Sequence, residues 1–258
     1  MDEKKLQILK EYTGPDRVIS AAEMQLELDR APASIVKVKS LLPSMDAAIG
    51  DFRDGELVVI SGPTKNGKTL LAQTLTANFV LQQHFPLWFS YEVPARQFIS
   101  QFTELPMIYL PAKLKANAMN WLEERMIESH IKYNTRIVFI DHLHYLVDMA
   151  RIRNPSIEIG TVIRRLKSMA VENGFVIFLL CHTVKGKIES DLSFEAIRDS
   201  SFISQESDTV IMIRRTPADG ENAAEMRIEF HRRTGVFKKL VKLVKTNGFL
   251  KEAAKQGA

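Results

Sequence analysis

Only one cysteine, Cys181, occurs in the 258 residues of this chain. A single thiol excludes a disulfide framework and a zinc site built from cysteines, and it fits a reducing cytosol. The sequence has no run of about 18 apolar residues, so no transmembrane helix is expected. Its N-terminus, Met-Asp-Glu-Lys-Lys, also lacks the apolar segment of a secretory signal. These absences predict a cytoplasmic protein without a membrane partner.

A large excess of charge of one sign is also missing, since the net charge is +4. With 45% hydrophobic and 26% charged residues, the composition predicts one large α/β domain with a substantial core. The positive charge is concentrated near the C-terminus. From His231 onward the chain has one Glu and eight basic residues: Arg232, Arg233, Lys238, Lys239, Lys242, Lys245, Lys251 and Lys255. Such a stretch suggests a polyanionic partner, and a solvated basic tail is the alternative.

The chain does contain the signature of a phosphate-binding loop. Its residues are Gly62, Pro63, Thr64, Lys65, Asn66, Gly67, Lys68 and Thr69, which read G-x-x-x-x-G-K-[ST]. An apolar strand pattern over 56–61 precedes the loop, and an apolar helical pattern over 70–79 follows it. Because this motif requires a strand, a loop and a helix in that order, the sequence predicts a nucleotide-binding site.

Each residue type in this loop has a chemical task. Gly62 and Gly67 let the backbone curl so that its N–H groups point at phosphate oxygens, and the helix that begins at Gly67 adds the positive end of its dipole. Lys68 is expected to reach the β- and γ-phosphates, and the Thr69 hydroxyl to ligate Mg²⁺. The expected cofactors are therefore ATP and Mg²⁺, and Lys68 is expected to lie in an exposed loop.

Strand and helix patterns alternate after the loop. The expected strands are 86–91, 136–140, 175–180 and 208–213, the expected helices include 115–130 and 157–173, and 224–230 with 236–244 form a closing β-hairpin. This alternation predicts an α/β fold with a mainly parallel central sheet and helices on both faces. The expected parts are an N-terminal arm or linker over 1–40, an ATPase domain over 41–250 and a basic tail over 251–258.

Polar residues follow the apolar strands at their carboxyl ends, where ligands bind in open α/β sheets. Asp141 follows such a strand and is expected to bind Mg²⁺ directly or through water. Glu92 either polarises the attacking water as a general base or is an acid at the start of the next helix. If Glu92 is the general base, both carboxylates belong to the nucleotide site.

Histidines stand near the same strand ends. His182 is expected to contact the γ-phosphate, and an ordinary strand-end histidine is the alternative. His142 and His144 flank Leu143. Either one faces the site and the other the nucleic acid or the core, or both make ordinary polar contacts. The metal-ligand spacing H-E-x-x-H does not occur, so a metalloprotease site is not expected.

Taken together, these motifs resemble a known family. They occur in order at 57–69, 89–92, 139–142, 179–182, 197–208 and 230–235. This set is similar to the ATPase domain of the replicative hexameric helicases of the DnaB type and their phage relatives, over about residues 40 to 250. Only the phosphate loop is specific by itself; the others are specific as a set.

The resemblance implies a RecA-like P-loop core, ATP-driven movement on single-stranded DNA, and a ring of identical subunits, expected to be a hexamer. It implies Glu92 as the catalytic carboxylate and His182 as the phosphate sensor. The family's late strand carries a Lys-x-Arg pair that reaches the neighbour's nucleotide. Arg233 fits the arginine finger of that pair, while His231 stands where the family has Lys, which puts the coupling between subunits in question.

The resemblance also implies that DNA is bound by loops after the core strands. The candidates are Arg151, Arg153, Lys185 and Lys187, with plain surface charge as the alternative. A primase or a loader is left open as a further partner, and docking through the N-terminal domain that precedes this core in bacterial relatives is not assumed. The lone-domain form hints at a viral or mobile-element origin.

Two other functions compete with a DNA helicase or translocase. One is a recombinase-like or signalling RecA-type ATPase that binds DNA and assembles with ATP without unwinding. The other is an accessory loader or regulator that uses ATP as an assembly switch. The stretch from Arg198 to Asp208 favours the helicase type.

Overall fold

The computed structural model describes residues 2–30, 36–147, 155–182 and 200–254. The chain divides into two units, Met1–Ser34 and Ile35–Ala258. The first unit contains α1 (Glu3–Lys10) and α2 (Ala21–Arg30), and neither helix buries a residue. In front of α2, the Glu23 carboxylate accepts a hydrogen bond from the backbone N–H of Ser20, and Ser20 Oγ accepts one from the N–H of Glu23. This capping box fixes the start of α2 without tertiary contacts.

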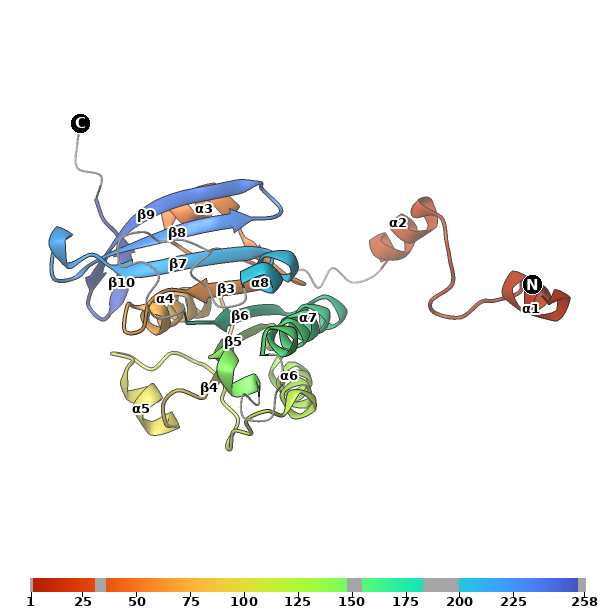
Figure 1. Ribbon diagram of the computed structural model, residues 1–258, viewed down its shortest axis with the longest axis horizontal. Helices are drawn as coiled ribbons and strands as arrows, with labels where there is room; N and C mark the ends of the chain where they lie inside the picture. The colour runs from red at the N-terminus through yellow and green to blue at the C-terminus, as the bar shows by residue number, and fades with distance from the viewer. Residues whose placement is uncertain (1, 31–35, 148–154, 183–199, 255–258) are drawn as a thin grey trace. The chain divides into compact units, whose positions relative to one another are not determined.

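The second unit is built on one mixed sheet (Figure 1). Within the described residues its order is β10-β9-β8-β7-β3-β6-β5-β4. The strands are β3 (Leu57–Ser61), β4 (Leu87–Ser90), β5 (Ile137–Asp141), β6 (Val176–Leu180), β7 (Thr209–Arg215), β8 (Ala223–His231), β9 (Val236–Thr246) and β10 (Phe249–Glu252). Strands β3 to β7 pair in parallel, and β7 to β10 pair antiparallel. A separate short pair joins β1 (Lys37–Val38) to β2 (Phe52–Arg53).

Helices cover both faces of this sheet, as the sequence predicts (Figure 1). They are α3 (Pro43–Ile49), α4 (Lys68–Leu81), α5 (Ala95–Ser100), α6 (Met119–Tyr133), α7 (Pro155–Asn173) and α8 (Ser200–Glu206), with 3-10 turns at Leu143–Leu146 and Pro217–Asp219. None of the described helices is long and apolar enough to cross a membrane.

The residues of β5 show how the two faces are filled. Phe139 packs with Trp88 and Phe178 in the core that also holds α4, with ring centroids 4.6 Å apart in both pairs. Its neighbours Val138 and Ile140 point into the second core, which holds α6 and α7. Because successive strand residues face opposite sides, a strand buried on both faces must be apolar throughout. The four apolar residues of β5, 137–140, follow this rule, and Asp141 ends the strand as a buried polar residue.

Some expected boundaries differ from the structure. The helix expected from residue 115 begins at Met119, because Asn117 has a left-handed backbone, with φ 52°, that a helix cannot contain. Helix α8 and strand β10 were not expected. Strand β10 runs through Lys251 and Glu252, the first residues assigned to the basic tail. There the Glu252 carboxylate accepts hydrogen bonds from the backbone N–H and Oγ of Ser44.

Candidate nucleotide-binding site

The phosphate-loop signature joins the carboxyl end of β3 to the start of α4. Gly67 has φ 98° and Gly62 has φ 152°, conformations that side chains rarely allow. A Cβ at Gly62 would lie 2.0 Å from the carbonyl oxygen of Ile213 on β7, so only glycine fits beside that strand. Asn66 holds the loop, since its amide nitrogen donates to the Thr64 carbonyl and its Oδ1 accepts from the backbone N–H of Arg215.

Lys68 does not lie in an exposed loop, so that expectation was wrong. It is the first residue of α4 and is 5% exposed. Its Nζ donates hydrogen bonds to the carbonyl oxygens of Gly62 at 2.9 Å and Pro63 at 2.8 Å. Burial lowers the pKa of Lys68 to about 8, and the nearby carboxylates of Glu92 and Asp141 oppose that shift. The ammonium is thus folded under the loop, in the space that the curled backbone encloses.

Thr69 and Asp141 form the second part of the site. Thr69 Oγ1, on the first turn of α4, donates a 2.9 Å hydrogen bond to Oδ2 of Asp141 at the end of β5. Asp141 is 3% exposed, and burial raises the pKa of its carboxyl to about 6 while the Thr69 hydrogen bond opposes the rise. A hydroxyl and a carboxylate facing each other at this distance offer the oxygen ligands that Mg²⁺ prefers. These residues therefore fit the expected ion.

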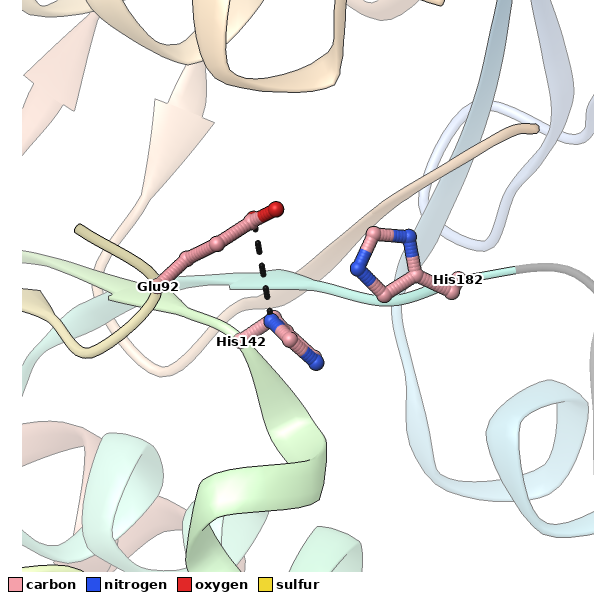
Figure 2. A group of neighbouring side chains, drawn as sticks. All are labelled: Glu92, His142 and His182. Atoms are coloured by element: carbon pink, nitrogen blue, oxygen red, sulfur yellow. Dashed lines mark ion pairs between the residues drawn. The ribbon is translucent and has the colours of Figure 1, made fainter. Parts of the chain in front are cut away.

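Three further side chains gather where neighbouring strands end (Figure 2), and one of them, Glu92, is close enough to Asp141 to affect its pKa. Glu92 follows β4, His142 follows β5 and His182 follows β6. Oε2 of Glu92 lies 3.8 Å from Nδ1 of His142, and the rings of His142 and His182 lie 4.3 Å apart. Burial lowers the pKa of His142 to about 3 and that of His182 to about 4. Both imidazoles are therefore neutral at pH 7, and the contact between Glu92 and His142 is not an ion pair there.

Glu92 lies beside Lys68 and Asp141 and is open to solvent. Its side chain is 40% exposed, so water reaches the carboxylate. It is close enough to Lys68 and Asp141 to affect the pKa of each. Glu92 does not cap the next helix, α5. The N-cap residue of α5 is Pro94, and no side chain makes a capping hydrogen bond there. The position favours the base over the helix-start acid.

His231 and Arg233 lie at the other end of the sheet from the phosphate loop. Arg233 forms ion pairs of 3.2 Å with Glu56, which precedes β3, and with Asp51. Because the loop follows the same strand, about six residues and roughly 20 Å separate Glu56 from Gly62. Arg233 therefore cannot serve the nucleotide site of its own chain.

His231, which stands where the resemblance implies a lysine, is buried and bonded within its own chain. His231 is 1% exposed, and its Nδ1 lies 2.7 Å from Oγ1 of Thr209. Burial lowers the pKa of His231 to about 4. A neutral, buried ring bonded inside its own chain cannot extend a positive charge toward a neighbour.

The candidate DNA-binding residues Arg151, Arg153, Lys185 and Lys187 lie outside the described residues. Two features of the site were not predicted: His142 as the third member of the Glu92 and His182 group, and the pairing of Arg233 with Asp51 and Glu56. The sequence did contain a signal for the role of His142, because this residue directly follows Asp141, which was already assigned to the site. No local sequence pattern predicted the pairing of Arg233 with Glu56 and Asp51, because Arg233 is more than 170 residues away from them in the sequence.

The strand, glycine loop and helix, with Lys68 beneath the loop and Thr69 facing Asp141, define a P-loop nucleotide-binding protein with a RecA-like core. A sequence model described as the DnaB-like helicase C terminal domain matches residues 101–249. The chain therefore belongs to the DnaB-like helicase C-terminal domain family. That match begins after the phosphate loop, so the loop motif and the family match are independent observations.

Individual relatives agree with this assignment. The replicative DNA helicase DnaB of Treponema pallidum (strain Nichols) is 24% identical, over 72% of this chain and 50% of that protein. The chain thus spans half the length of that relative. Among solved structures, one described as an ATPase domain is similar with a TM-score of 0.76 at 18% identity, covering 90% of this chain and 97% of that one. A DnaB-like replicative helicase, described with its interactions with primase, has a TM-score of 0.75 at 19% identity over 96% of this chain and 70% of that one.

Proposed function

We propose that this protein is an ATP-dependent DNA helicase or translocase of the DnaB type, which hydrolyses ATP at subunit interfaces of a ring and moves on single-stranded DNA. The observation that carries the proposal is the convergence of Lys68, the Thr69–Asp141 pair and Glu92 at the carboxyl ends of β3, β4 and β5. The family assignment supports DNA as the track along which ATP hydrolysis drives movement.

Each residue then has a role in hydrolysis. The N–H groups of the loop and the Nζ of Lys68, released from the Gly62 and Pro63 carbonyls, hold the phosphates. Thr69 and Asp141 supply oxygen ligands to Mg²⁺, which when bound neutralises charge on the β- and γ-phosphates. Glu92 accepts the proton of the attacking water. His182 reports on the γ-phosphate from the end of the adjacent β6.

The ring is proposed because the site of a single chain is incomplete. Arg233 lies at the far end of β3 from its own loop, and a neighbouring copy would bring it to the next nucleotide. To do so, Arg233 must leave Asp51 and Glu56 at least in part. We expect a hexamer, as in the family, in the cytoplasm.

The DNA would lie against the loops that carry Arg151, Arg153, Lys185 and Lys187. Contacts of this kind bind phosphates and are blind to sequence. A primase is a further proposed partner, because a similar helicase structure has been described with its interactions with primase. A loader is proposed on the resemblance alone.

Two measurements test the proposal. The ATPase rate should rise when single-stranded DNA is added, and the protein should displace a strand from a forked duplex with ATP but not with a non-hydrolysable analogue. A DNA-stimulated ATPase that never displaces a strand would indicate the RecA or recombinase-like alternative. ATP binding and assembly without any stimulation by DNA would indicate a regulatory switch.

A further inference from the structure

Three potential metal ligands lie close together at the carboxyl ends of neighbouring strands. A carboxylate oxygen of Glu92 and one ring nitrogen each of His142 and His182 all lie within 4.8 Å of one another. They follow β4, β5 and β6, which are neighbours in the sheet, and the three side chains point toward one another (Figure 2). The ends of three neighbouring strands therefore bring this group together, and it is named here the Glu-His-His cluster.

The two histidines have bonding capacity that the protein does not use. The Nδ1 atoms of both His142 and His182 are buried and have no hydrogen-bond partner among the described residues. His142 is only 9% exposed. Buried polar atoms are normally paired, and an unpaired one calls for an explanation such as an ion. The unpaired nitrogens lie in the cluster that also has a carboxylate available.

We propose that the Glu-His-His cluster binds a divalent transition-metal ion of the Zn²⁺ type through Glu92, His142 and His182, with a fourth position open to water. Two imidazoles and one carboxylate with an open position are a common ligand set for such an ion. Ligand atoms around tetrahedral Zn²⁺ lie roughly 3.3 Å apart. The side chains must therefore approach one another by up to about 1.5 Å. Glu92, which is 40% exposed, has room to move.

The ligand chemistry separates this ion from Mg²⁺. Thr69 and Asp141 offer oxygen atoms alone, which suits Mg²⁺. The Glu-His-His cluster offers two nitrogens, which Mg²⁺ binds poorly and which Zn²⁺, Co²⁺ and Ni²⁺ bind well. Two neighbouring positions of different ligand type thus select different ions.

The local charge permits a cation. The Lys68 ammonium is close enough to affect both histidines and opposes binding, while the carboxylates of Glu92 and Asp141 favour it. One positive and two negative groups leave a net negative charge around the cluster. The positive charge of the bound ion is therefore balanced by the negative charge of these groups.

Binding at this cluster has a consequence for hydrolysis, and this part rests on the proposed function. An ion on Glu92 uses the carboxylate that would accept the proton of the attacking water. It also holds His182, the proposed γ-phosphate sensor. A transition-metal ion should therefore inhibit ATP hydrolysis even when Mg²⁺ is saturating.

The first test measures binding alone and needs no activity. The full chain is freed of metal with a chelator, titrated with Co²⁺, and followed by the visible absorption of tetrahedral Co²⁺, with Zn²⁺ as competitor. We expect one ion per chain, displaced by Zn²⁺ and not by Mg²⁺. His182→Ala and Glu92→Gln should each weaken binding at least about tenfold, and His142→Ala likewise if circular dichroism shows that it folds.

The matched control is His84→Ala, a histidine outside the cluster, half-buried in the turn after α4. Absence of the Co²⁺ band in wild type, or equal binding by His84→Ala, His182→Ala and Glu92→Gln, would overturn the site. The second test adds Zn²⁺ to saturating Mg²⁺ and ATP, with chelator to reverse the effect. Inhibition of wild type and of His84→Ala supports the consequence, and Co²⁺ binding without inhibition overturns the consequence alone. If the chain hydrolyses no ATP, the proposed function fails while the binding test still decides the site.

Discussion

Thr69 Oγ1 donates a 2.9 Å hydrogen bond to Oδ2 of Asp141, and this contact joins the first turn of α4 to the end of β5 across 72 residues of sequence. The two side chains are therefore positioned against each other by the fold before any ion is bound. Such positioning lowers the cost of assembling a metal site, because the ligands need little further ordering. The nucleotide site is best understood as this pair with Lys68 on one side and Glu92 on the other.

Lys68→Ala should abolish ATP binding or hydrolysis while the protein stays folded. The variant loses two hydrogen bonds to loop carbonyls, but it also removes an ammonium whose burial is itself unfavourable, so the two effects partly offset. Binding of a fluorescent ATP analogue and circular dichroism give the two readouts. Lys132→Ala, which removes an exposed cation on α6, outside the loop, is the control. Normal turnover in a folded Lys68→Ala protein would contradict the phosphate-loop assignment.

Glu92→Gln should keep the affinity for ATP and Mg²⁺ and lose turnover by about 10²–10⁴-fold. The amide has the shape of the carboxylate but cannot accept the proton. Steady-state ATPase rates and nucleotide binding should be compared with those of Glu104→Gln, an exposed glutamate outside the site. Turnover within a few-fold of wild type would leave Glu92 without a catalytic role.

Arg233→Ala should bind ATP and hydrolyse it poorly, because a finger from the neighbour stabilises charge in the transition state by an effect of about 10³–10⁵-fold. The variant should also be less stable, since it leaves Glu56, which is 7% exposed, without its ion-pair partner. Mixing Arg233→Ala with Lys68→Ala should restore part of the activity. One interface then pairs an intact loop with an intact arginine. Co-assembled rings with no activity beyond that of the separate variants would argue against a shared site.

DNA binding should weaken steeply as salt rises and depend little on sequence. Removing two of the proposed phosphate contacts, with Arg151→Ala and Arg153→Ala together, should reduce the slope of log affinity against log salt by about 1.4. Fluorescence anisotropy on single strands of different sequence measures this. Lys132→Ala, on the exposed face of α6 and paired with Glu128, should leave the slope unchanged. An equal slope for the double variant and wild type would exclude these arginines from the DNA contact.

His231 should contribute, beside His142 and His182, whose pKa values are also lowered by burial, to a fall in the stability of the protein as pH drops from about 6.5 to 4. The pKa of His231 is lowered to about 4, chiefly by burial and also by Arg233 and Arg53, while Asp208 and Asp51 oppose the shift. Between the two pKa values the unfolded chain binds the extra proton, so acid favours unfolding, by up to about 3 kcal/mol for this group. Above pH 6.5 neither state is protonated there, and the contribution is constant.

Urea unfolding at pH 7 and at pH 4.5 measures the effect. His231→Asn keeps a polar atom near Oγ1 of Thr209 and does not titrate in this range, so its free energy of unfolding should change less between the two pH values. If wild type and His231→Asn lose the same stability on acidification, His231 is not the group responsible.

Much of the fold could be predicted because its causes are local. The alternation of apolar runs and helical patterns indicated the parallel strands, and Gly174, with φ 64°, follows α7 as a helix-ending glycine should. Strand β10 and helix α8 escaped prediction because they are short and carry no strong periodicity. Their stability comes from tertiary contacts, as when the backbone N–H of Leu250 donates to Oγ1 of Thr74 on α4.

The sequence by itself determined the phosphate loop, since the backbone angles that Gly62 and Gly67 adopt depend on the lack of a side chain, and it determined the order of strands along the chain. Only the tertiary structure decided the order of strands in the sheet, in which β6 lies between β3 and β5. That order brings Glu92, His142 and His182 together, and the antiparallel direction of β8 places Arg233 at the opposite end of the strands from its own Lys68. The reason is physical: backbone conformation follows from neighbouring residues, whereas contacts between distant residues follow from how buried faces pack.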